Sequence, residues 1–125
     1  MKGQDNFREL LGIKTVEVRE NYAKMSMKVT KAHMNFYGAT HGGVVFSLAD
    51  CAFAEAVNCG GAIAVAVQAS INFLKPSVEG DTLTAEAVKV SEGRTFGLYN
   101  ITVRKEDKVV AVFSGLAYKQ QQQMG

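Results

Sequence analysis

Apolar and polar residues alternate along the first part of the chain. From Val16 to Val18, and again from Ala23 to Val29, apolar side chains occupy every second position and charged or polar ones fill the gaps. A period of two is typical of strands with one buried face, and Glu20-Asn21 supplies a turn between the two runs. The pattern therefore predicts a β-hairpin. From Lys31 to Thr40 the periodicity is absent and Gly38 interrupts the segment, which predicts a loop.

The segment from His41 to Asn58 has a different pattern. It is rich in alanine, apolar around almost its whole circumference, and followed by Gly60-Gly61, which favours the end of a helix. We expect one long helix here. A helix without a polar face has to be enclosed by other elements, and in a chain of 125 residues only a curved sheet can enclose it.

Four further stretches have the character of strands. The last two are joined by the charged turn from Lys105 to Lys108, and Pro76 marks the exit from the first one. The order of two strands, one helix and four strands predicts an α+β fold with an antiparallel sheet. We expect a single domain from residue 1 to 119 and a disordered tail from 120 to 125. The four predicted strands are Ala62–Leu74, Thr82–Val90, Thr95–Arg104 and Val109–Tyr118.

Composition and charge narrow the class of protein. With a net charge of +2 and 21% charged residues, the chain lacks the clustered basic stripe of a nucleic-acid binder. No uncharged apolar stretch reaches the roughly 18 residues of a transmembrane helix, and the apolar patch from Leu10 to Ile13 is too short for a signal peptide. Cys51 and Cys59 lie about 12 Å apart along the expected helix, beyond disulfide reach. We therefore expect a cytoplasmic protein with free thiols that binds neither nucleic acid nor membrane.

Asp50 is the first candidate for chemistry, because it stands between Ala49 and Cys51 in an otherwise apolar helix. Burying an unpaired carboxylate is costly, and carboxylates with perturbed pKa values gather at functional sites. The alternative is a helical aspartate that faces a solvated edge or accepts a structural hydrogen bond. A nucleophilic role for Cys51 is disfavoured, because a cysteine in the middle of an apolar helix is usually a packing residue.

Gly42 and Gly43 open the expected helix. Unpaired backbone N–H groups and the positive end of the helix dipole can polarise a carbonyl there, and the missing side chains permit close approach. The alternative is a plain turn into the helix. Gly42 and Asp50 are about 12 Å apart along one helix, so they cannot easily act on one carbonyl within a single chain. Two such helices running antiparallel across a dimer interface would bring them together, and we expect an active site shared between subunits.

The residues around this glycine pair include two further candidates. His41 directly precedes the helix and is a candidate for orienting a carbonyl or a water, with a structural role as the alternative. Asn35 is a candidate hydrogen-bond donor, although an asparagine in a loop often satisfies its own backbone. His33 is expected to face solvent. The sequence contains no Gly-x-Ser-x-Gly elbow, phosphate-binding loop or His/Cys metal cluster, so we expect no serine triad, metal or cofactor.

The stretch from Asn35 to Gly43, continued by Phe46 to Ala54, resembles the PaaI-like (phenylacetate-degradation) hot-dog thioesterases. The order of Asn, His-Gly-Gly and Leu-Ala-Asp carries this resemblance, which extends from about Leu10 to Tyr118. It implies the hot-dog fold, in which a long central helix is wrapped by a curved antiparallel sheet. It also implies a homodimer or a dimer of dimers, a homotetramer.

The same resemblance implies roles for individual residues. Asp50 would act as general base or nucleophile, and the Gly42 backbone N–H would polarise the thioester oxygen. Asn35 and His41 would position water and carbonyl. Two further segments are expected to contact coenzyme A, with ordinary surface roles for their cations as the alternative. These are Asn72, Lys75 and Pro76 for the pantetheine arm, and Gly93, Arg94 and Thr95 for the nucleotide side.

The acyl end of the substrate is the least determined part. Where some members of the family place a serine or threonine near the catalytic centre, this chain offers Gln68, which leaves water positioning and substrate choice open. Phe36, Tyr37 and Phe53 are candidates for lining an aryl pocket. Together these features predict an acyl-CoA thioesterase for a small acyl group, with aromatic groups of the hydroxyphenylacetyl type among the candidates. Coenzyme A enters only as part of the substrate.

Two other functions remain open on the sequence. A hot-dog hydratase or dehydratase acting on acyl-CoA also uses an aspartate and a histidine on this scaffold. A non-catalytic module that binds acyl-CoA or an aromatic ligand would explain the interior rich in methionine and phenylalanine. Release of free thiol from acyl-CoA separates hydrolysis from both alternatives.

Overall fold

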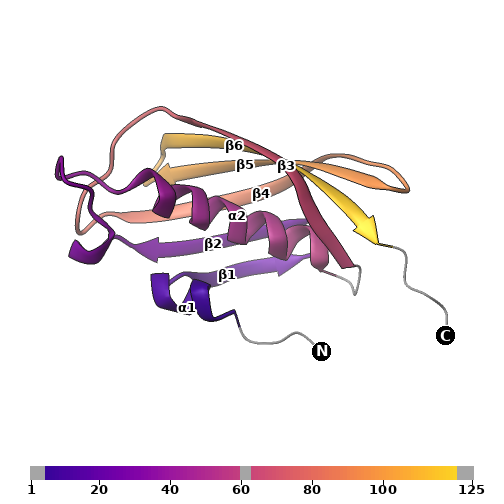
Figure 1. Ribbon diagram of the computed structural model, residues 1–125, viewed down its shortest axis with the longest axis horizontal. Helices are drawn as coiled ribbons and strands as arrows, with labels where there is room; N and C mark the ends of the chain where they lie inside the picture. Colours follow the sequence, from indigo (N-terminus) through magenta and orange to yellow (C-terminus); the bar gives the residue numbers. More distant parts are fainter. Residues whose placement is uncertain (1–4, 60–62, 121–125) are drawn as a thin grey trace.

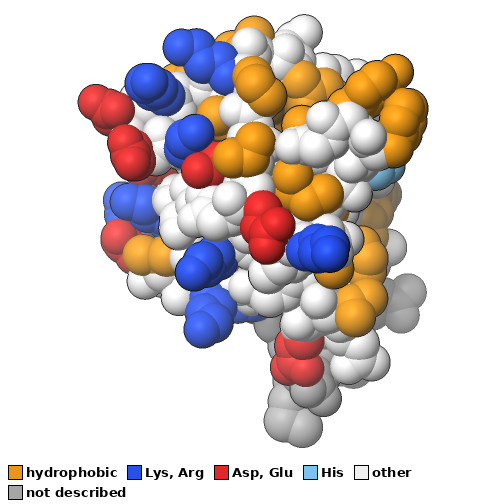
Figure 2. Space-filling view, turned by 90° about the vertical axis from the view of Figure 1, so that its left-hand side faces the viewer, with side chains coloured by type: hydrophobic (Ala, Val, Ile, Leu, Met, Phe, Trp, Pro, Cys, Tyr) orange, Lys and Arg blue, Asp and Glu red, His pale blue; other side chains and the backbone are white. Residues whose placement is uncertain are grey.

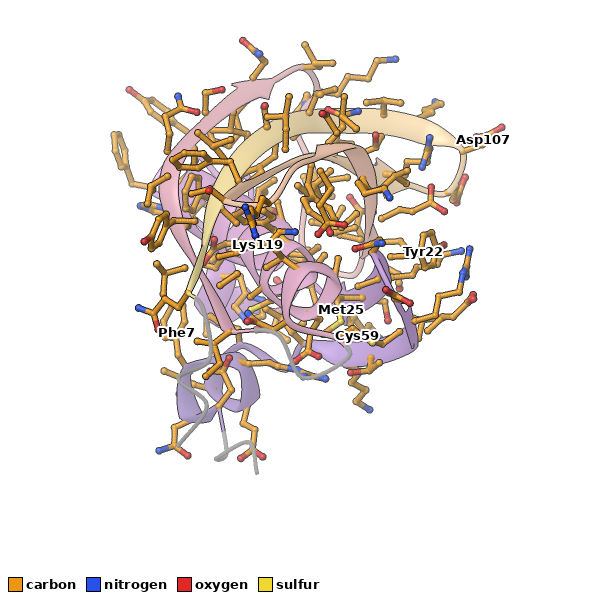
Figure 3. The ribbon with its side chains drawn as sticks, turned by 90° about the vertical axis from the view of Figure 1, so that its right-hand side faces the viewer. Phe7, Tyr22, Met25, Cys59, Asp107 and Lys119 are labelled. Carbon is orange, nitrogen blue, oxygen red and sulfur yellow. The ribbon has the colours of Figure 1, made fainter. Side chains whose placement is uncertain are left out.

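The structure, a computed structural model, describes residues 5–59 and 63–120. A long helix, α2 (Gly42–Asn58), lies across a six-stranded antiparallel sheet that curves around it (Figures 1 and 3). The predicted α+β fold with a central helix is therefore confirmed. The enclosure is one-sided, however, because Gly43 and Ala54 are exposed and form an open ridge along α2. Among the described residues, no helix is long and apolar enough to cross a membrane.

The strands follow the predicted order along the chain. The first two form the predicted hairpin, the last three form a meander, and the strand after α2 crosses to the far edge of the sheet and pairs with the last strand. The order across the sheet is β1-β2-β4-β5-β6-β3, which leaves β1 and β3 at the edges. The bounds are β1 Lys14–Arg19, β2 Tyr22–Lys28, β3 Ile63–Phe73, β4 Thr82–Glu92, β5 Phe96–Lys105 and β6 Lys108–Gln120.

Some predicted boundaries fall at or beyond the described residues. The expected helix stop at Gly60-Gly61 and the expected strand start at Ala62 lie outside them. Gln120, which we expected to begin the disordered tail, is the last residue of β6. The rest of the predicted tail, residues 121–125, lies outside the described part of the chain.

A short helix precedes the sheet where we expected only an apolar patch. This helix, α1 (Asn6–Leu11), begins at Asp5, whose side chain accepts a hydrogen bond from the Arg8 N–H, and ends at Gly12 in the left-handed conformation with φ 74°. The Arg8 guanidinium lies 3.3 Å from the Glu55 carboxylate and so ties α1 to α2. Both helix ends therefore have the caps that stabilise short helices.

The prediction that His33 faces solvent is wrong. His33 ends a 3-10 turn, η1 (Lys31–His33), and is only 7% exposed. Its Nδ1 accepts a hydrogen bond of 3.0 Å from the Thr30 N–H, and its carbonyl oxygen accepts one of 2.8 Å from the His41 N–H. The polar loop buries this imidazole because the ring caps the backbone of the turn. His33 therefore helps to fix the backbone just before α2.

Phe53 belongs to the core between α2 and the sheet. Its ring lies 5.8 Å from the ring of Tyr99 and 6.0 Å from that of Phe113, and the side chain is 1% exposed. A Cβ atom at Gly115 of β6 would lie 2.7 Å from the Phe53 ring, so this glycine permits the close approach of α2. The prediction that Phe53 lines an aryl pocket is corrected, because the side chain as it lies has no surface to offer a substrate.

The edge strand β3 is open to solvent along most of its length. Within Ile63–Phe73, Ala64 is buried and Ile71 is half-buried, and the other residues are exposed. Val65 and Val67 are 46% and 53% exposed. Long apolar edge strands are usually covered in soluble proteins, since their free N–H and C=O groups invite pairing.

Candidate active site

The beginning of α2 leaves one backbone donor free. His41 is the N-cap residue, and its Nδ1 accepts a hydrogen bond of 2.9 Å from the Gly43 N–H. The N–H groups of Val44 and Val45 both donate to the His41 carbonyl oxygen. No described residue accepts a hydrogen bond from the Gly42 N–H. This N–H and the positive end of the α2 dipole are therefore available to an oxygen of a ligand.

The hydrogen bond to Gly43 also fixes the tautomer of His41. Because Nδ1 accepts a hydrogen bond, the proton of the neutral ring resides on Nε2. The side chain is exposed, so this Nε2–H can reach a ligand at the start of α2. His41 therefore has the structural role of capping α2 through Nδ1. Its Nε2–H is still available to a ligand.

The Asn35 side chain also combines a structural hydrogen bond with a free donor. Its Oδ1 accepts hydrogen bonds from the N–H groups of Tyr37 and Ala39, at 2.9 and 3.1 Å. Two N–H donors require an oxygen at that end of the amide, so the NH₂ group points away from the turn. No described residue accepts a hydrogen bond from it. The side chain therefore satisfies its own loop and still carries a donor for a ligand.

Asp50 is half-buried in the third turn of α2. Burial raises the pKa of its carboxyl group above the ordinary value, and the negative charge of Asp5 at the start of α1 raises it further. None of the described residues donates a hydrogen bond to this carboxylate. A carboxylate that lacks donors and has a raised pKa is a better proton acceptor once it is ionised.

The thiol of Cys51, next to Asp50 in the sequence, is held in an unreactive form. Burial, together with the carboxylates of Asp5 and Asp50, raises the pKa of Cys51 to about 12. A thiol with such a pKa is almost entirely protonated at neutral pH, and the thiolate is the reactive form. The prediction that Cys51 is a packing residue is consistent with this environment.

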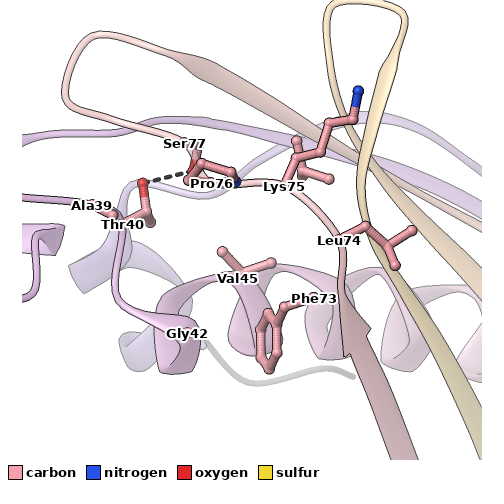
Figure 4. A pocket seen from close by; sticks show the side chains of 10 residues that line it. Ala39, Thr40, Gly42, Val45, Phe73, Leu74, Lys75, Pro76 and Ser77 are labelled. Carbon is pink, nitrogen blue, oxygen red and sulfur yellow. Dashed lines mark hydrogen bonds between the residues drawn. The ribbon is translucent and has the colours of Figure 1, made fainter.

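A groove adjoins the free N–H of Gly42 (Figure 4). It has a volume of about 340 Å³ and runs between the start of α2 and the segment that leaves β3. The Phe73 ring stands against Gly42, where an added Cβ atom would lie 3.3 Å from it. The groove brings Gly42 together with Lys75 and Pro76, two of the residues predicted to contact the pantetheine arm.

Thr40, Phe73 and Ser77 also line this groove, and the sequence prediction did not name them as site residues. Thr40 and Ser77 are joined by a hydrogen bond of 2.7 Å between their hydroxyl oxygens, drawn as a dashed line in Figure 4. Phe73 and Ser77 are far from Gly42 in the sequence, and no local pattern predicts that they lie beside it. The nearest sequence signal to Phe73 and Ser77 is Pro76, which marks the end of the predicted strand.

Gln68 and Asn72 lie on the other face of the sheet. A bulge at Val67 interrupts the pairing of β3 with β6, and beyond it Ala69 pairs with Gly115, which contacts α2. Gln68 and Asn72 alternate with the residues that face α2 and therefore point away from it. The bulge is the reason, since strict alternation from the buried Ala64 would turn Gln68 toward α2. The expectation that Gln68 lies near the catalytic centre, in a site shared between subunits, stays a prediction.

The turn Gly93-Arg94-Thr95 lies at the opposite end of the sheet from the Gly42 groove (Figure 1). The Gly93 N–H donates to the Phe96 carbonyl oxygen at 2.8 Å, and the Thr95 carbonyl oxygen accepts from the Lys119 N–H at 2.7 Å. Arg94 is exposed and makes no ion pair with any described residue. Within one chain the structure therefore brings Asn35, His41, Gly42, Lys75 and Pro76 to one end, and separates them from Asp50 and Arg94.

The end of the molecule that carries the start of α2 has a mixed surface (Figure 2). Basic and acidic side chains are interspersed mainly on the left of this view, apolar ones gather mainly at its top and right, and the described part of this face has no continuous basic stripe. This mixture matches the net charge of +2. A phosphate-bearing ligand at this face would be held by a few placed cations.

The chain thus offers a free N–H at the start of α2, an open groove beside this N–H, and a half-buried carboxylate further along the same helix. The family model of the thioesterase superfamily matches residues 37–112, which include Gly42 and Asp50. The chain is also 41% identical to the acyl-coenzyme A thioesterase PaaI of Escherichia coli over 120 residues, covering 95% of this chain and 86% of the relative. The chain therefore belongs to the thioesterase superfamily.

Solved structures agree with this assignment and with the predicted hot-dog fold. The PaaI protein of E. coli, from the phenylacetic acid degradation operon, superposes with a TM-score of 0.91 at 40% identity, over 94% of this chain and 86% of that one. The TT0310 protein of Thermus thermophilus gives 0.90 at 35% identity, over 93% and 98%. The smu.793 protein of Streptococcus mutans, bound to acetyl CoA, gives 0.85 at 27% identity, over 98% and 94%. The PaaI-like resemblance stated from the sequence is thus confirmed.

Proposed function

We propose that this chain hydrolyses the thioester bond of a small acyl-CoA, in a site formed by Gly42 of one protomer and Asp50 of its partner. One observation carries the proposal, namely the unbonded Gly42 N–H at the start of α2, which opens on a groove shared with Lys75 and Pro76. The names of the similar proteins support the substrate class, since one is an acyl-CoA thioesterase and another binds acetyl CoA.

The chemistry needs few groups. In our proposal the Gly42 N–H donates to the thioester oxygen, where negative charge develops as the carbonyl is attacked. Asp50 either takes a proton from the attacking water or attacks the carbonyl carbon itself. The C–S bond then breaks and coenzyme A leaves as a thiolate. If Asp50 is the nucleophile, this step leaves a mixed anhydride on Asp50, which water hydrolyses to release the acid and restore the carboxylate. A thiol with a pKa near that of free cysteine, about 8.5, leaves without a strong general acid.

Helix geometry argues for a site between two protomers. Gly42 and Asp50 are eight residues apart on α2, which corresponds to about 12 Å along the axis. The open edge of β3 and the exposed ridge of α2 are surfaces that a second copy can cover. If two copies meet edge to edge about a twofold axis, their α2 helices run antiparallel, and Asp50 of one approaches Gly42 of the other. Further assembly to a dimer of dimers is part of the proposal.

The remaining residues are proposed to hold the substrate. Lys75 and Pro76 would contact the pantetheine arm in the groove, and the Arg94 turn, at the far end of each protomer, would reach the nucleotide bound to the partner. Asn35 would direct its free NH₂ group, and His41 its Nε2–H, toward the carbonyl and the attacking water. Phe36 and Tyr37 are 88% and 80% exposed, and their rings lie 4.1 Å apart in the same loop as Asn35. We propose that they cover the acyl group.

Thiol release tests this function directly. The wild-type protein, mixed with a panel of aryl, short-chain and long-chain acyl-CoAs, should release free coenzyme A to a thiol-reactive dye. Asp50→Asn should slow this release by at least about a hundredfold, as expected when a catalytic base is removed, while binding of acyl-CoA is retained. Thiol release that is unchanged by Asp50→Asn would refute the assignment. A hydratase would consume an enoyl-CoA without releasing thiol.

A further inference from the structure

A buried pair of hydroxyl groups joins the residue before the active-site turn to the segment after β3. Thr40 and Ser77 are 8% and 4% exposed, and their side-chain oxygens are 2.7 Å apart (Figure 4). The Thr40 N–H also donates to the Ser77 carbonyl oxygen at 2.8 Å. Two hydrogen bonds, one from side chains and one from the backbone, therefore connect positions that are 37 residues apart in the sequence.

Both residues of this pair are next in sequence to residues of the proposed site. Thr40 is followed by His41, the N-cap of α2, and then by Gly42. Ser77 is preceded by Lys75 and Pro76, which line the same groove. The latter segment is anchored to the sheet, because the N–H groups of Leu74 and Lys75 both donate to the Val110 carbonyl oxygen, at 2.8 and 3.1 Å. The start of α2 is thus tied through Ser77 to a segment that the sheet holds.

We propose that the Thr40–Ser77 pair is a positioning device that sets the direction of the Gly42 N–H relative to the groove. The inference rests on the function proposed above. The hydrogen bond of the buried pair is worth more than that of an exposed one, because a buried hydroxyl without its partner loses its hydrogen bonds to water as well. Catalytic donors also tolerate little displacement, since a misplacement of about 1 Å can cost a factor of about 10² in rate.

Thr40→Val and Ser77→Ala test the inference, because each removes one hydroxyl and leaves the backbone hydrogen bond possible. We expect kcat to fall by about tenfold in each variant, with KM changed by less than about twofold, since the donor is misaligned but present. Thr40→Ser retains the hydroxyl and should restore kcat to within about twofold of wild type. Thr102→Val, on a threonine of β5 outside the site, is the matched control and should leave both constants unchanged.

A spectroscopic measurement distinguishes positioning from general destabilisation. Acyl-CoA labelled with ¹³C at the thioester carbonyl is bound to the Asp50→Asn protein, and its carbonyl stretch is recorded by Raman difference spectroscopy. A well-aimed Gly42 N–H lowers this frequency, and adding Thr40→Val should move it back toward the value of free substrate. An unchanged frequency and an unchanged kcat in both hydroxyl variants would overturn the positioning role. Absence of thiol release by the wild-type protein would instead overturn the proposed function.

Discussion

Replacing Gly42 with proline removes one hydrogen-bond donor and little else. Gly42 is the first residue of α2, where proline is well tolerated because the N–H has no partner within the helix. His41 has φ −60° and ψ 134°, the extended conformation that a residue before proline requires. The backbone of Gly42 is not in the left-handed region. The substitution should therefore fold, and proline can add about 0.4–1 kcal/mol of stability by restricting the unfolded chain.

The expected effect on catalysis is large. Loss of one oxyanion donor costs about 10²–10³ in kcat, or about 2.7–4 kcal/mol of transition-state stabilisation. Gly42→Ala is the matched control, because it introduces the same Cβ atom 3.3 Å from the Phe73 ring and keeps the N–H. The Phe73 side chain is 55% exposed and can move aside. We expect Gly42→Pro to release thiol at least about a hundredfold more slowly than Gly42→Ala, with a Tm no lower than that of the control. Equal rates in the two variants would refute the role of this N–H.

Three further predictions concern α2 and the strand packed against it. The pKa of the Asp50 carboxyl group is raised above 3.8 in the folded chain. The protonated carboxyl group therefore favours the folded state at low pH, and this contribution to the free energy of unfolding is lost as the pH rises through the pKa of the folded chain. Asp50→Asn should therefore raise the Tm at pH 7 and not at pH 3, as measured by thermal unfolding, while a higher Tm at pH 3 alone would contradict the burial argument. Gly115→Ala should destabilise the protein by about 1–3 kcal/mol, because the new Cβ atom would overlap the Phe53 ring. Denaturant unfolding checks this value, and Phe53→Leu in the same chain should recover part of it. Cys51→Ser should retain thiol release within about threefold, because a thiol with a pKa of about 12 is no nucleophile at neutral pH. A hundredfold loss would reopen a catalytic role for Cys51.

The elements that the sequence predicts well are those with a local pattern. Alternation over β1 and β2, and the alanine-rich run of α2, depend on neighbouring residues, and the structure confirms both. The helix α1 was missed because it has only 6 residues, although Asp5 and Gly12 cap it. His33 was misplaced because a polar loop usually faces water, whereas this ring is turned inward to cap its own backbone.

In the candidate site, too, the sequence predicted the residues that have a local pattern and missed the contacts between distant segments. Gly42 and Asp50 were found because a glycine pair and a lone carboxylate stand out in one apolar segment. The contacts of Thr40 with Ser77 and of Phe73 with Gly42 join distant parts of the chain, and no local signal reports them. The direction of Gln68 could not be read from the sequence, since a bulge of a single residue reverses every later side chain of a strand.

The central claim is that one active site uses Gly42 of one protomer and Asp50 of its partner. It is tested most directly by co-expressing Asp50→Asn and Gly42→Pro chains with different affinity tags and purifying the mixed dimer. Each parent variant should be nearly inactive. The mixed dimer has one site with both groups intact and one with neither, so we predict about half of the wild-type thiol release per dimer. A mixed dimer as inactive as its parents would contradict the account, because it would place both groups in a site within one chain.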